Sequence, residues 1–596
     1  MSWQPNSVQR RARIASGLLF LTFVFLLGSF FRTQVLLYDT YRLTSETNRL
    51  REVPVPAARG QVYDRRGAII AENIPGYTVS ILAPSADSLR AALTRLSGAV
   101  PMSDEQVETV VRRYRKNPAR PAVVLGDATF DQVSILEEHR VQFPGLIIQA
   151  TPKRYYPDGA AVSALMGYTG EITEGELLSK NFIGYKPGQQ VGKGGIEKQY
   201  ESRLRGREGV RFVEVDARGR VVREAGARPE LAPIAAQPLY TNIDLDLQKF
   251  IVDIFGDSLT GAVVAIEPKT GEVLALHSAP TFDANRFIGG IPIDYWRALN
   301  TDVRKPLYNK ALQGTYPPGS TWKLATAIVG MQNGLVKMDD HMPVACTGGF
   351  QFGNRFFKCH KKEGHGSLSL AGAIEQSCDV YFYQLGLRIN VARLVEGGIA
   401  LGTGERSGID LPSESRPSFP RPNATAYYDA KFGKNGWNAS QSLNLAIGQG
   451  DNSQTVVNMA KFYTALANGG DVARPQVVHG NSEKTRLFTV DSAQMAGIRA
   501  ALAGVVSRGT AAGSRIEGLQ LAGKTGTAQS GKKIGEVELN HAWFAGYAPA
   551  DAPQIVVVVM LEFGGHGTRS AHIASKIFEH YLKRSVKQTI STEGDE

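Results

Sequence analysis

Hydrophobic and polar positions divide the chain into a short apolar segment, a middle part of mixed pattern and a long C-terminal part. Residues 14–31 are apolar or small throughout, and they reach the roughly 17–25 residues that cross a bilayer as a helix. Three arginines precede them (Arg10, Arg11 and Arg13), and positive charge favours the cytoplasmic side. A cleaved signal peptide is the alternative, but no small-residue cleavage site follows Phe31. We predict a cytoplasmic tail (1–13) and an uncleaved anchor (14–34), with the remainder outside the cytoplasm.

The middle part, residues 35–235, alternates short β-type runs with helical patterns, which predicts an elongated mixed α/β pedestal. A helix over 35–53 is expected to end before Pro54, because proline cannot continue a helix. Turn residues at 64–67 separate two β-type runs and indicate a hairpin. The Pro- and Ala-rich run 229–238 is typical of a linker and marks a domain boundary.

Other segments of the middle part carry weaker signals. Further strands are expected at 77–81, 122–125 and 146–148, and a second hairpin at 210–222. Residues 188–200 are rich in glycine, but the spacing differs from that of a phosphate-binding loop. We therefore predict a structural turn before a short helix there.

The C-terminal part, residues 236–584, has strand patterns near both of its ends and helical patterns between them. Residues 261–275 fit a strand, a turn and a strand, and 555–561 is almost entirely β-branched, as in a central strand covered on both faces. A last helix places five apolar or aromatic residues on one face (Ala574, Ile577, Phe578, Tyr581 and Leu582). The order predicts an α/β (α+β) domain with helices flanking a sheet. Residues 585–596 are predicted to be a flexible tail.

Composition narrows the class of protein. The chain has 596 residues, of which 43% are hydrophobic and 21% charged, so it is long enough for two or more globular domains. Its net charge is +11, yet no dense Lys/Arg run or nucleic-acid motif is found. We therefore expect no nucleic-acid partner, and a basic surface that faces anionic lipids or an anionic polymer.

The main chemical signal is a serine and a lysine three residues apart, Ser320 and Lys323, at the start of an apolar helical pattern. The preceding Pro-Pro-Gly fits the start of a helix, in which residues three apart share one face. A serine hydroxyl needs a neighbouring base to become a nucleophile. A lysine can be that base when burial or a second cation lowers its pKa. Alone, the common Ser-x-x-Lys spacing favours a solvated lysine in a first helical turn.

Two further motifs follow in the order that this chemistry requires. Ser377-Cys378-Asp379 has the form Ser-x-Asn/Asp, and Lys524-Thr525-Gly526-Thr527 contains Lys-Thr-Gly. The ordered set of three is the signature of penicillin-recognising serine enzymes. Three ordered matches make chance a minor explanation.

Together with the anchor, Arg59-Gly60 and the segment 192–200, these motifs resemble the class B penicillin-binding proteins, and most closely their elongation (rod-shape) branch, the penicillin-binding protein 2 type. Residues 446–450 also fit the pattern found before Lys-Thr-Gly in this family. The resemblance covers almost the whole chain beyond the anchor. It implies the penicillin-binding transpeptidase fold, with an antiparallel sheet flanked by helices, on the periplasmic side of the inner membrane.

The resemblance also implies an activity and partners. The activity is serine-type D,D-transpeptidation, or carboxypeptidation, of peptidoglycan stem peptides, and β-lactams block it as mimics of the donor. The partners are a SEDS-type glycan polymerase, docked by the pedestal, and rod-shape scaffold proteins. Residues 32–230 have neither the length nor the helical pattern of a lysozyme-like glycosyltransferase domain.

The roles of single residues are carried over from the same family. Ser320 attacks the D-Ala-D-Ala carbonyl, and Lys323, held neutral near Lys524, takes its proton. Backbone N–H groups of Ser320 and Thr527 form the oxyanion hole. Ser377, in the motif that Asp379 completes, passes a proton to the leaving D-alanine. The expected carboxylate-binding group is Thr525, Gly526 and Thr527, with plain strand-edge threonines as the structural alternative.

The chain has only three cysteines, Cys346, Cys359 and Cys378, and His365 lies between the last two. Three thiolates and one imidazole can complete a tetrahedral Zn²⁺ site, and some relatives carry a structural zinc at matching positions. Cys378 lies inside the Ser-x-Asp motif, so the metal would brace the loop of Ser377. The alternative is a Cys346–Cys359 disulfide with Cys378 as a buried thiol. His360 is a further candidate ligand.

Other functions remain compatible with the fold. A β-lactam-hydrolysing enzyme needs a deacylating base, and no Glu-x-x-Leu-Asn segment lies between Asp379 and Lys524. A penicillin sensor needs a cytoplasmic signalling domain, for which the tail before the anchor is too short. A scaffold role is compatible with catalysis. The division-specific transpeptidases are the nearest competitor, and Asp379 with the Cys/His set favours the elongation type.

Overall fold

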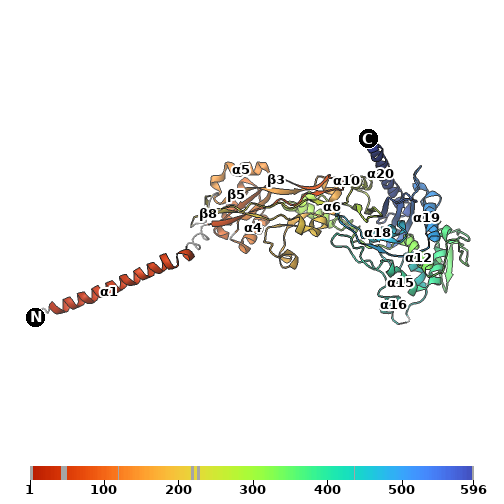
Figure 1. Cartoon of the computed structure of the whole chain (residues 1–596), viewed down its shortest axis with the longest axis horizontal. Coiled ribbons are helices and arrows are strands. Elements are labelled where there is room, and N and C mark those ends of the chain that lie inside the picture. The colour runs from red at the N-terminus through yellow and green to blue at the C-terminus, as the bar shows by residue number, and fades with distance from the viewer. Residues whose placement is uncertain are drawn as a thin grey trace.

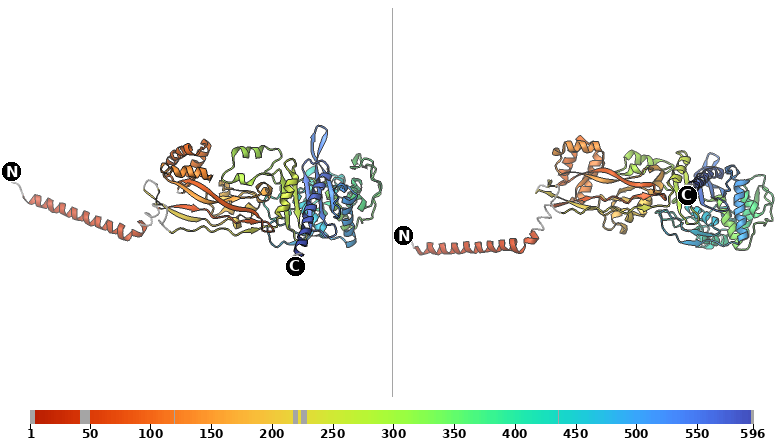
Figure 2. Two further views of the ribbon diagram at one scale, coloured as in Figure 1. Left: turned by 90° about the horizontal axis from the view of Figure 1, so that it is seen from above. Right: turned by 45° about the horizontal axis from the view of Figure 1, so that its top comes forward.

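The computed structural model describes residues 5–41, 50–118, 120–216, 221–223, 229–434 and 436–593. This part of the chain forms an elongated molecule, with a long helix at one end, a pedestal in the middle and a second domain at the other end (Figure 1). Two further views show the same succession (Figure 2).

The N-terminal helix α1 (Pro5–Phe31) continues into a π-helical turn (Arg32–Leu36), and its described side chains are exposed. The stretch Val8–Leu36, of 29 residues, is long and apolar enough to cross a membrane, and it contains the predicted anchor. Helical structure begins before residue 14 because glutamine, arginine and alanine, which fill positions 9–13, are good helix formers.

The first sheet of the pedestal corrects one prediction. Its order is β1-β8-β9, over Leu50–Val55, Gly209–Val215 and Val221–Arg223. The expected helix over 35–53 therefore gives way to strand from Leu50, while 38–41 is helical and 42–49 lies outside the described residues. β1 pairs antiparallel with β8 and forms the edge of the sheet. Pro54, which has no N–H, is tolerated there because the outward side of an edge strand has no hydrogen-bonding partner. Burial of Val53 beside Val213 makes strand pairing prevail over the local helical pattern.

The second sheet of the pedestal has the order β10-β2-β3-β4, with β5 also paired to β3. β2 and β3 are antiparallel, which confirms the hairpin predicted around 64–67. The strand expected at 77–81 is the second half of the longer β3. The strands are β2 (Val62–Tyr63), β3 (Ile69–Ile81), β4 (Ala122–Ala128), β5 (Leu146–Tyr155) and β10 (Leu239–Tyr240). Three helices enclose a separate apolar core with this sheet: α3 (Ala86–Ala99), α4 (Asp104–Lys116) and α5 (Phe130–Glu138).

The rest of the pedestal consists of short elements. The glycine-rich segment forms strand β7 and then the short helix α8, which confirms the predicted turn before a helix. Residues 229–238 run partly as an extended segment, with bridges from Leu231 and Ile234 to β8 and its approach. The short elements are α6 (Gly159–Met166), β6 (Thr169–Glu171), α7 (Glu174–Leu177), β7 (Gln190–Gly192), α8 (Gly195–Gln199) and α9 (Glu201–Leu204).

The C-terminal domain is built on one antiparallel sheet in the order β12-β11-β19-β18-β17. β19 lies at the centre and is buried throughout, as its β-branched sequence predicts. Helices α18 and α20 pack against β18 and β19, and α19 packs against β17. The expected antiparallel sheet flanked by helices is confirmed. The strands are β11 (Gly261–Ile266), β12 (Val273–Ala279), β17 (Ala522–Ile534), β18 (Val537–Ala548) and β19 (Ile555–Leu561).

A helical region lies between β12 and β17 in the sequence. It contains the hairpin β13–β14 (Gly349–Phe352 and Arg355–Lys358). Its main helices are α12 (Lys323–Gln332), α13 (Leu370–Glu375), α14 (Asp379–Ile389), α15 (Val391–Ala400), α16 (Ala424–Phe432), α17 (Ser440–Ala446), α18 (Val456–Ala467) and α19 (Ser492–Ser507). Two more frame the domain, α10 (Leu245–Phe255) and α11 (Ile293–Thr301).

The last helix, α20, extends over Gly567–Glu593, beyond the predicted start of a tail at 585. No proline or glycine occurs between 568 and 593 to end it. The rest of the predicted tail, 594–596, lies outside the described residues.

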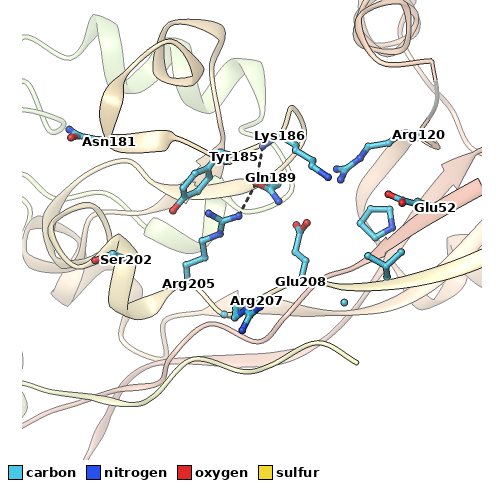
Figure 3. Close-up of a pocket in the computed structure, with 15 residues that line it drawn as sticks. Glu52, Arg120, Asn181, Tyr185, Lys186, Gln189, Ser202, Arg205, Arg207 and Glu208 are labelled. Atoms are coloured by element: carbon cyan, nitrogen blue, oxygen red, sulfur yellow. Dashed lines mark hydrogen bonds between the residues drawn. The ribbon is translucent and has the colours of Figure 1, made fainter. Parts of the chain in front are cut away.

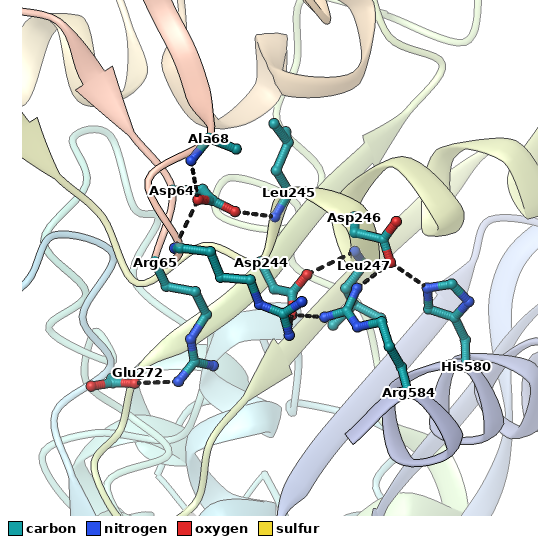
Figure 4. Close-up of polar contacts among 11 residues, drawn as sticks. Asp64, Arg65, Ala68, Asp244, Leu245, Asp246, Leu247, Glu272, His580 and Arg584 are labelled. Atoms are coloured by element: carbon teal, nitrogen blue, oxygen red, sulfur yellow. Dashed lines mark hydrogen bonds and ion pairs between the residues drawn. The ribbon is translucent and has the colours of Figure 1, made fainter. Parts of the chain in front are cut away.

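Charged groups fasten the pedestal to the C-terminal domain (Figure 4). Asp64, in the β2–β3 turn, accepts hydrogen bonds from the backbone N–H groups of Ala68 (2.7 Å) and Leu245 (3.3 Å). Asp244 caps α10 and forms ion pairs with Arg66 of the pedestal hairpin and with Arg584 of α20. One network therefore joins the pedestal hairpin, α10 and the last helix.

A second, buried network lies under the pedestal side of this junction. Glu197 of α8 is fully buried and accepts hydrogen bonds from Arg59 (2.6 Å), Arg154 (2.6 Å) and the Tyr156 hydroxyl (3.1 Å). Burial alone would raise the pKa of Glu197, but the guanidinium groups of Arg154 and Arg59 outweigh it and hold the pKa below its usual value. The two pedestal segments that carry the family resemblance, Arg59-Gly60 and 192–200, thus meet in one ion-pair network.

Candidate active site

The serine motif forms a tight turn before a helix. Ser320 lies in a 3₁₀ turn (Gly319–Trp322), and α12 begins at Lys323 rather than at the serine. Gly319 has a φ of 54°, and a Cβ there would lie 2.7 Å from the carbonyl oxygen of Thr527. Its N–H donates a hydrogen bond to the carbonyl of Gly448 (2.9 Å). The turn is therefore held between β17 and the segment 446–450.

Lys323 joins the first motif to the second. Its side chain is fully buried, and Nζ donates to the backbone carbonyl of Ser377 (2.7 Å) and lies 3.2 Å from Ser377 Oγ. Nζ also forms an ion pair with Asp379 Oδ1 (2.8 Å). The Ser-x-x-Lys and Ser-x-Asp motifs, more than fifty residues apart in the chain, thus lie in one hydrogen-bonded group.

Ser377 has a left-handed backbone, with φ at 56°, in the connection between α13 and α14. This conformation costs a residue other than glycine about 1 kcal/mol or more, and it persists only where the surroundings hold it. The contacts from Lys323 to both the carbonyl and the hydroxyl of Ser377 supply part of that constraint. The backbone conformation thereby aims this hydroxyl at the lysine.

The second amine of the site, Lys524 of β17, is also fully buried. Burial and the charge of Lys323 lower the pKa of Lys524 well below its usual value. Burial would raise the pKa of Asp379, but Lys323 and a hydrogen bond from His360 hold it well below its usual range. Lys323 thus pairs with Asp379, whereas Lys524 is the amine whose pKa its surroundings lower; that Lys323 acts as the neutral base remains a prediction.

The Lys-Thr-Gly strand lies directly against the serine turn. A Cβ at Gly526 would meet the carbonyl oxygen of Pro318 at 2.9 Å, so glycine permits this approach. Thr527 is exposed, and its hydroxyl accepts a hydrogen bond from the N–H of Gly567 (3.3 Å). Thr525 is buried, with its hydroxyl 2.6 Å from that of Thr510. Of the two predicted carboxylate ligands, Thr527 is therefore the accessible one in this arrangement.

The three cysteines and His365 form one cluster. Their candidate ligand atoms all lie within 4.8 Å of one another, and the three thiols are unbonded. His365 Nδ1 lies 3.5 Å from Cys346 Sγ and 3.6 Å from Cys359 Sγ. Tetrahedral zinc with bonds of about 2.3 Å to sulfur and 2.0 Å to nitrogen separates its ligand atoms by roughly 3.5–3.8 Å. The donor set and its spacing thus fit Zn²⁺, whereas the alternative Cys346–Cys359 disulfide is not formed.

Comparison with known proteins identifies the family. A model of the penicillin binding protein transpeptidase domain matches residues 261–583, and one of the penicillin-binding protein dimerisation domain matches residues 54–232. The chain belongs to the penicillin-binding proteins. A curated relative, peptidoglycan D,D-transpeptidase MrdA of Acinetobacter baumannii, is 33% identical over 97% of this chain and 89% of its own length.

Solved structures agree with this assignment of a penicillin-binding protein. PBP2 of Helicobacter pylori, in its complex with MreC, has a TM-score of 0.78 at 27% identity, over 90% of this chain and 99% of that one. A chain of a peptidoglycan synthase complex, from a study of coordinated polymerization and crosslinking, has a TM-score of 0.68 at 29% identity, over 96% of this chain and 98% of that one. The resemblance to penicillin-binding protein 2 is thereby confirmed.

Two residues of the site in this penicillin-binding protein lie outside the predicted functional set, and a third, His360, was considered only as a metal ligand. Gly448 lies in the segment 446–450, which entered only the family resemblance, and its carbonyl accepts the hydrogen bond that fixes the serine turn. The hydroxyl of Thr510 contacts that of Thr525. The backbone N–H of His360 donates to Asp379 Oδ2 (3.0 Å), so the residue after Cys359 steadies the partner of Lys323. No motif marks Thr510 or the N–H of His360, because both act through contacts between segments distant in sequence.

Proposed function

We propose that this penicillin-binding protein is a peptidoglycan D,D-transpeptidase that forms an acyl-enzyme at Ser320 during cell elongation. The observation that carries the proposal is the hydrogen-bonded group of Lys323, Ser377 and Asp379, beside a serine turn that touches the Lys524 strand. Relatives named peptidoglycan D,D-transpeptidase MrdA, at 30–33% identity over nearly the full chain, support it.

The chemistry proceeds in two halves. Ser320 Oγ attacks the carbonyl of the terminal D-Ala-D-Ala bond, and its proton passes to Lys323. The N–H groups of Ser320 and Thr527 stabilise the oxyanion, and Ser377 delivers a proton to the nitrogen of the departing D-alanine. An amine of a neighbouring strand then takes the acyl group from Ser320. With water in place of the amine, the same intermediate yields carboxypeptidase activity.

Proton transfer from Ser320 requires a neutral amine beside its hydroxyl. The substrate carboxylate near Thr527 and Lys524 raises the pKa of the Lys524 amine, because an opposite charge favours the ammonium form. A positive charge on Lys524 then disfavours a second ammonium group at Lys323, as required for Lys323 to act as the base. Substrate binding thus prepares the base only when the donor is in place.

We also propose the location and partners. The apolar helix α1 anchors the chain in the inner membrane, with the arginines at its start on the cytoplasmic side and the C-terminal domain in the periplasm. The MreC complex of the H. pylori protein and the synthase complex support a scaffold protein and a glycan polymerase as partners.

Zinc is proposed as a structural metal held by Cys346, Cys359, His365 and Cys378. When bound, it would cross-link the β13–β14 hairpin, the loop of His365 and the Ser377 loop. Its effect on catalysis would pass through chain geometry, because Cys378 lies between Ser377 and Asp379. The burial of all three thiols and their spacing to His365 support the proposal.

Labelling with a fluorescent penicillin, followed by mass spectrometry of the adduct, tests the function. We expect one adduct per chain, on Ser320, and none in Ser320→Ala protein. The released D-alanine from a donor peptide, together with a cross-linked product, distinguishes a turning-over enzyme from a β-lactam-binding scaffold. An adduct on another residue, or none in folded protein, would remove the assignment.

A further inference from the structure

A cavity of about 550 Å³ lies within the pedestal, and all of its lining residues fall between Glu52 and Val210 (Figure 3). Its walls come from β1, β8, the segment before β4 and the loop before β7. This volume is within the range of pockets that hold small ligands. The cavity has no part in the acyl-transfer chemistry, because no residue of the serine site contributes to it.

The cavity gathers charges of both signs that lack partners. Its cations include Arg120, Lys186 and Arg207, and its carboxylates are Glu52 and Glu208. Among the described residues, no ion pair joins any of these cations to either carboxylate. Elsewhere in the pedestal such groups are paired, as in Lys153–Asp127, Lys193–Glu176 and Arg113–Glu171. Figure 3 shows the ends of Arg120 and Lys186 pointing toward one another, with Glu208 directed into the space below them.

One wall of the cavity is held in place before any ligand arrives. Arg205 lies 3.6 Å from the centroid of the Tyr185 ring and donates to Gln189 Oε1 (3.2 Å). The Tyr185 hydroxyl donates to Glu201 (3.1 Å), which also pairs with Arg59 of the buried network (2.8 Å). Because a preorganised wall loses little entropy on binding, this geometry favours binding of a ligand along it, although Lys186 and Arg207 of the lining are exposed.

We propose that this cavity binds a short zwitterionic peptide with free carboxylates and a free amine. A carboxylate between Arg120 and Lys186 relieves their mutual repulsion through charge-assisted hydrogen bonds, and the amine pairs with Glu208. A ligand with only negative charge leaves both carboxylates of the cavity without a partner. The uncrosslinked stem peptide carries the required groups, and naming it as the natural ligand rests on the proposed function.

Isothermal titration calorimetry of the full-length protein with a synthetic stem-type pentapeptide, bearing a free side-chain amine, tests this site. Acylation of Ser320 with penicillin beforehand blocks the cleft. We expect saturable binding that weakens about tenfold in the Arg120→Gln/Lys186→Gln double variant, because two charge-assisted contacts are lost. The same peptide with its amine acetylated should also bind more weakly. The neutral replacements avoid new repulsion, and melting temperatures check the fold of each variant.

Arg95→Gln, which removes an exposed arginine of α3 outside the cavity, is the matched control and should bind as the parent does. Absence of saturable binding, or equal affinity in the double variant, would overturn the site. Equal binding of the acetylated peptide would overturn the zwitterionic ligand and leave a plain anion site. If Ser320 does not take penicillin, the proposed function fails instead, and Ser320→Ala protein still decides the cavity.

Discussion

Two buried lysines of the active site illustrate how single residues acquire different proton affinities. Lys323 faces Asp379 at 2.8 Å, whereas the described contact of Lys524 Nζ is the carbonyl of Thr525 at 3.1 Å. A carboxylate favours the ammonium form of a neighbouring amine, while burial disfavours it. The pKa of Lys524 therefore lies well below its usual value, and burial is the largest cause.

Asp379→Asn should move the acidic limb of the acylation pH profile to lower pH. Acylation needs one neutral amine in the pair, and it fails when both lysines are protonated. The carboxylate of Asp379 acts to raise the pKa of Lys524, so its removal lowers that pKa further. The plateau rate should also fall about tenfold or more, since Lys323 loses a charged partner. Second-order acylation by a fluorescent penicillin between about pH 5 and pH 9 measures both effects.

Asp471→Asn is a suitable control, since this exposed carboxylate pairs with Arg486 away from the site. It should leave the profile unchanged. An acidic limb that stays in place, or moves to higher pH, in Asp379→Asn would contradict the assigned lysine pair.

At the scale of elements, the site depends on how closely the serine turn approaches β17. Gly319 and Gly526 are the two positions where a side chain would collide with backbone across this contact. Close packing without voids means that such an approach cannot widen by even a methyl group without displacing one of the elements. The absence of a side chain at both glycines therefore allows the serine turn and the Lys-Thr-Gly strand to lie in contact.

Gly319→Ala should slow acylation by about tenfold to a hundredfold, because its Cβ would lie 2.7 Å from Thr527 O and push the serine turn off β17. Gly531→Ala is the matched control. Gly531 has a similar left-handed backbone (φ 72°), but a Cβ there meets nothing within 4 Å. Both variants should lose about 1 kcal/mol of stability from backbone strain, and only Gly319→Ala should lose acylation as well. Equal acylation in the two variants would show that this contact does not position Ser320.

The thiol cluster belongs to the same scale, because it brings three loops together beside Ser377. Metal analysis should find one zinc per chain, and removal of the zinc with a chelator should lower the melting temperature and slow acylation. Cys346→Ser protein, deprived of one ligand, should already be slower and respond less to the chelator. Protein without zinc, in which only one thiol is titratable, would instead support the Cys346–Cys359 disulfide.

At the scale of the whole molecule, two charged networks hold the pedestal and the C-terminal domain as one elongated body. Arg584, Asp244 and Arg66 join the last helix to the first pedestal hairpin. Tyr200 follows the helix of buried Glu197 and donates to Asp410 of the C-terminal domain (2.6 Å). Any partner that moves the pedestal thus acts on groups that also touch the catalytic domain.

Glu197→Gln should destabilise the protein by about 3–5 kcal/mol, because it leaves the buried guanidinium groups of Arg59 and Arg154 without their counter-charge. Glu174→Gln, at an exposed pair with Lys116, should leave the stability almost unchanged. Calorimetric unfolding measures both. Since the pKa of Glu197 is lowered on folding, its contribution is full above the unfolded pKa, about 4.3, and is lost as the pH falls through the folded value. A Glu197→Gln protein as stable as the parent would contradict this role.

The sequence by itself determined the long apolar N-terminal helix, the central strand of the sheet and the three motifs of the site. An apolar run of bilayer length, a β-branched run and short motifs of fixed spacing are local patterns, and their physical meaning needs no knowledge of distant contacts. The grouping of the three cysteines with His365 was also predicted, because thiols and an imidazole are typical metal ligands.

Only the tertiary structure decided how those parts meet. Residues 50–53 became strand because β8 lies beside them, and Lys323 pairs with Asp379 because the fold brings these residues, far apart in the chain, together. The N–H of His360, the hydroxyl of Thr510 and the pedestal cavity have no sequence signature for the same reason. Proton affinity, strand pairing and cavities arise from neighbours in space, and one sequence records neighbours in the chain alone.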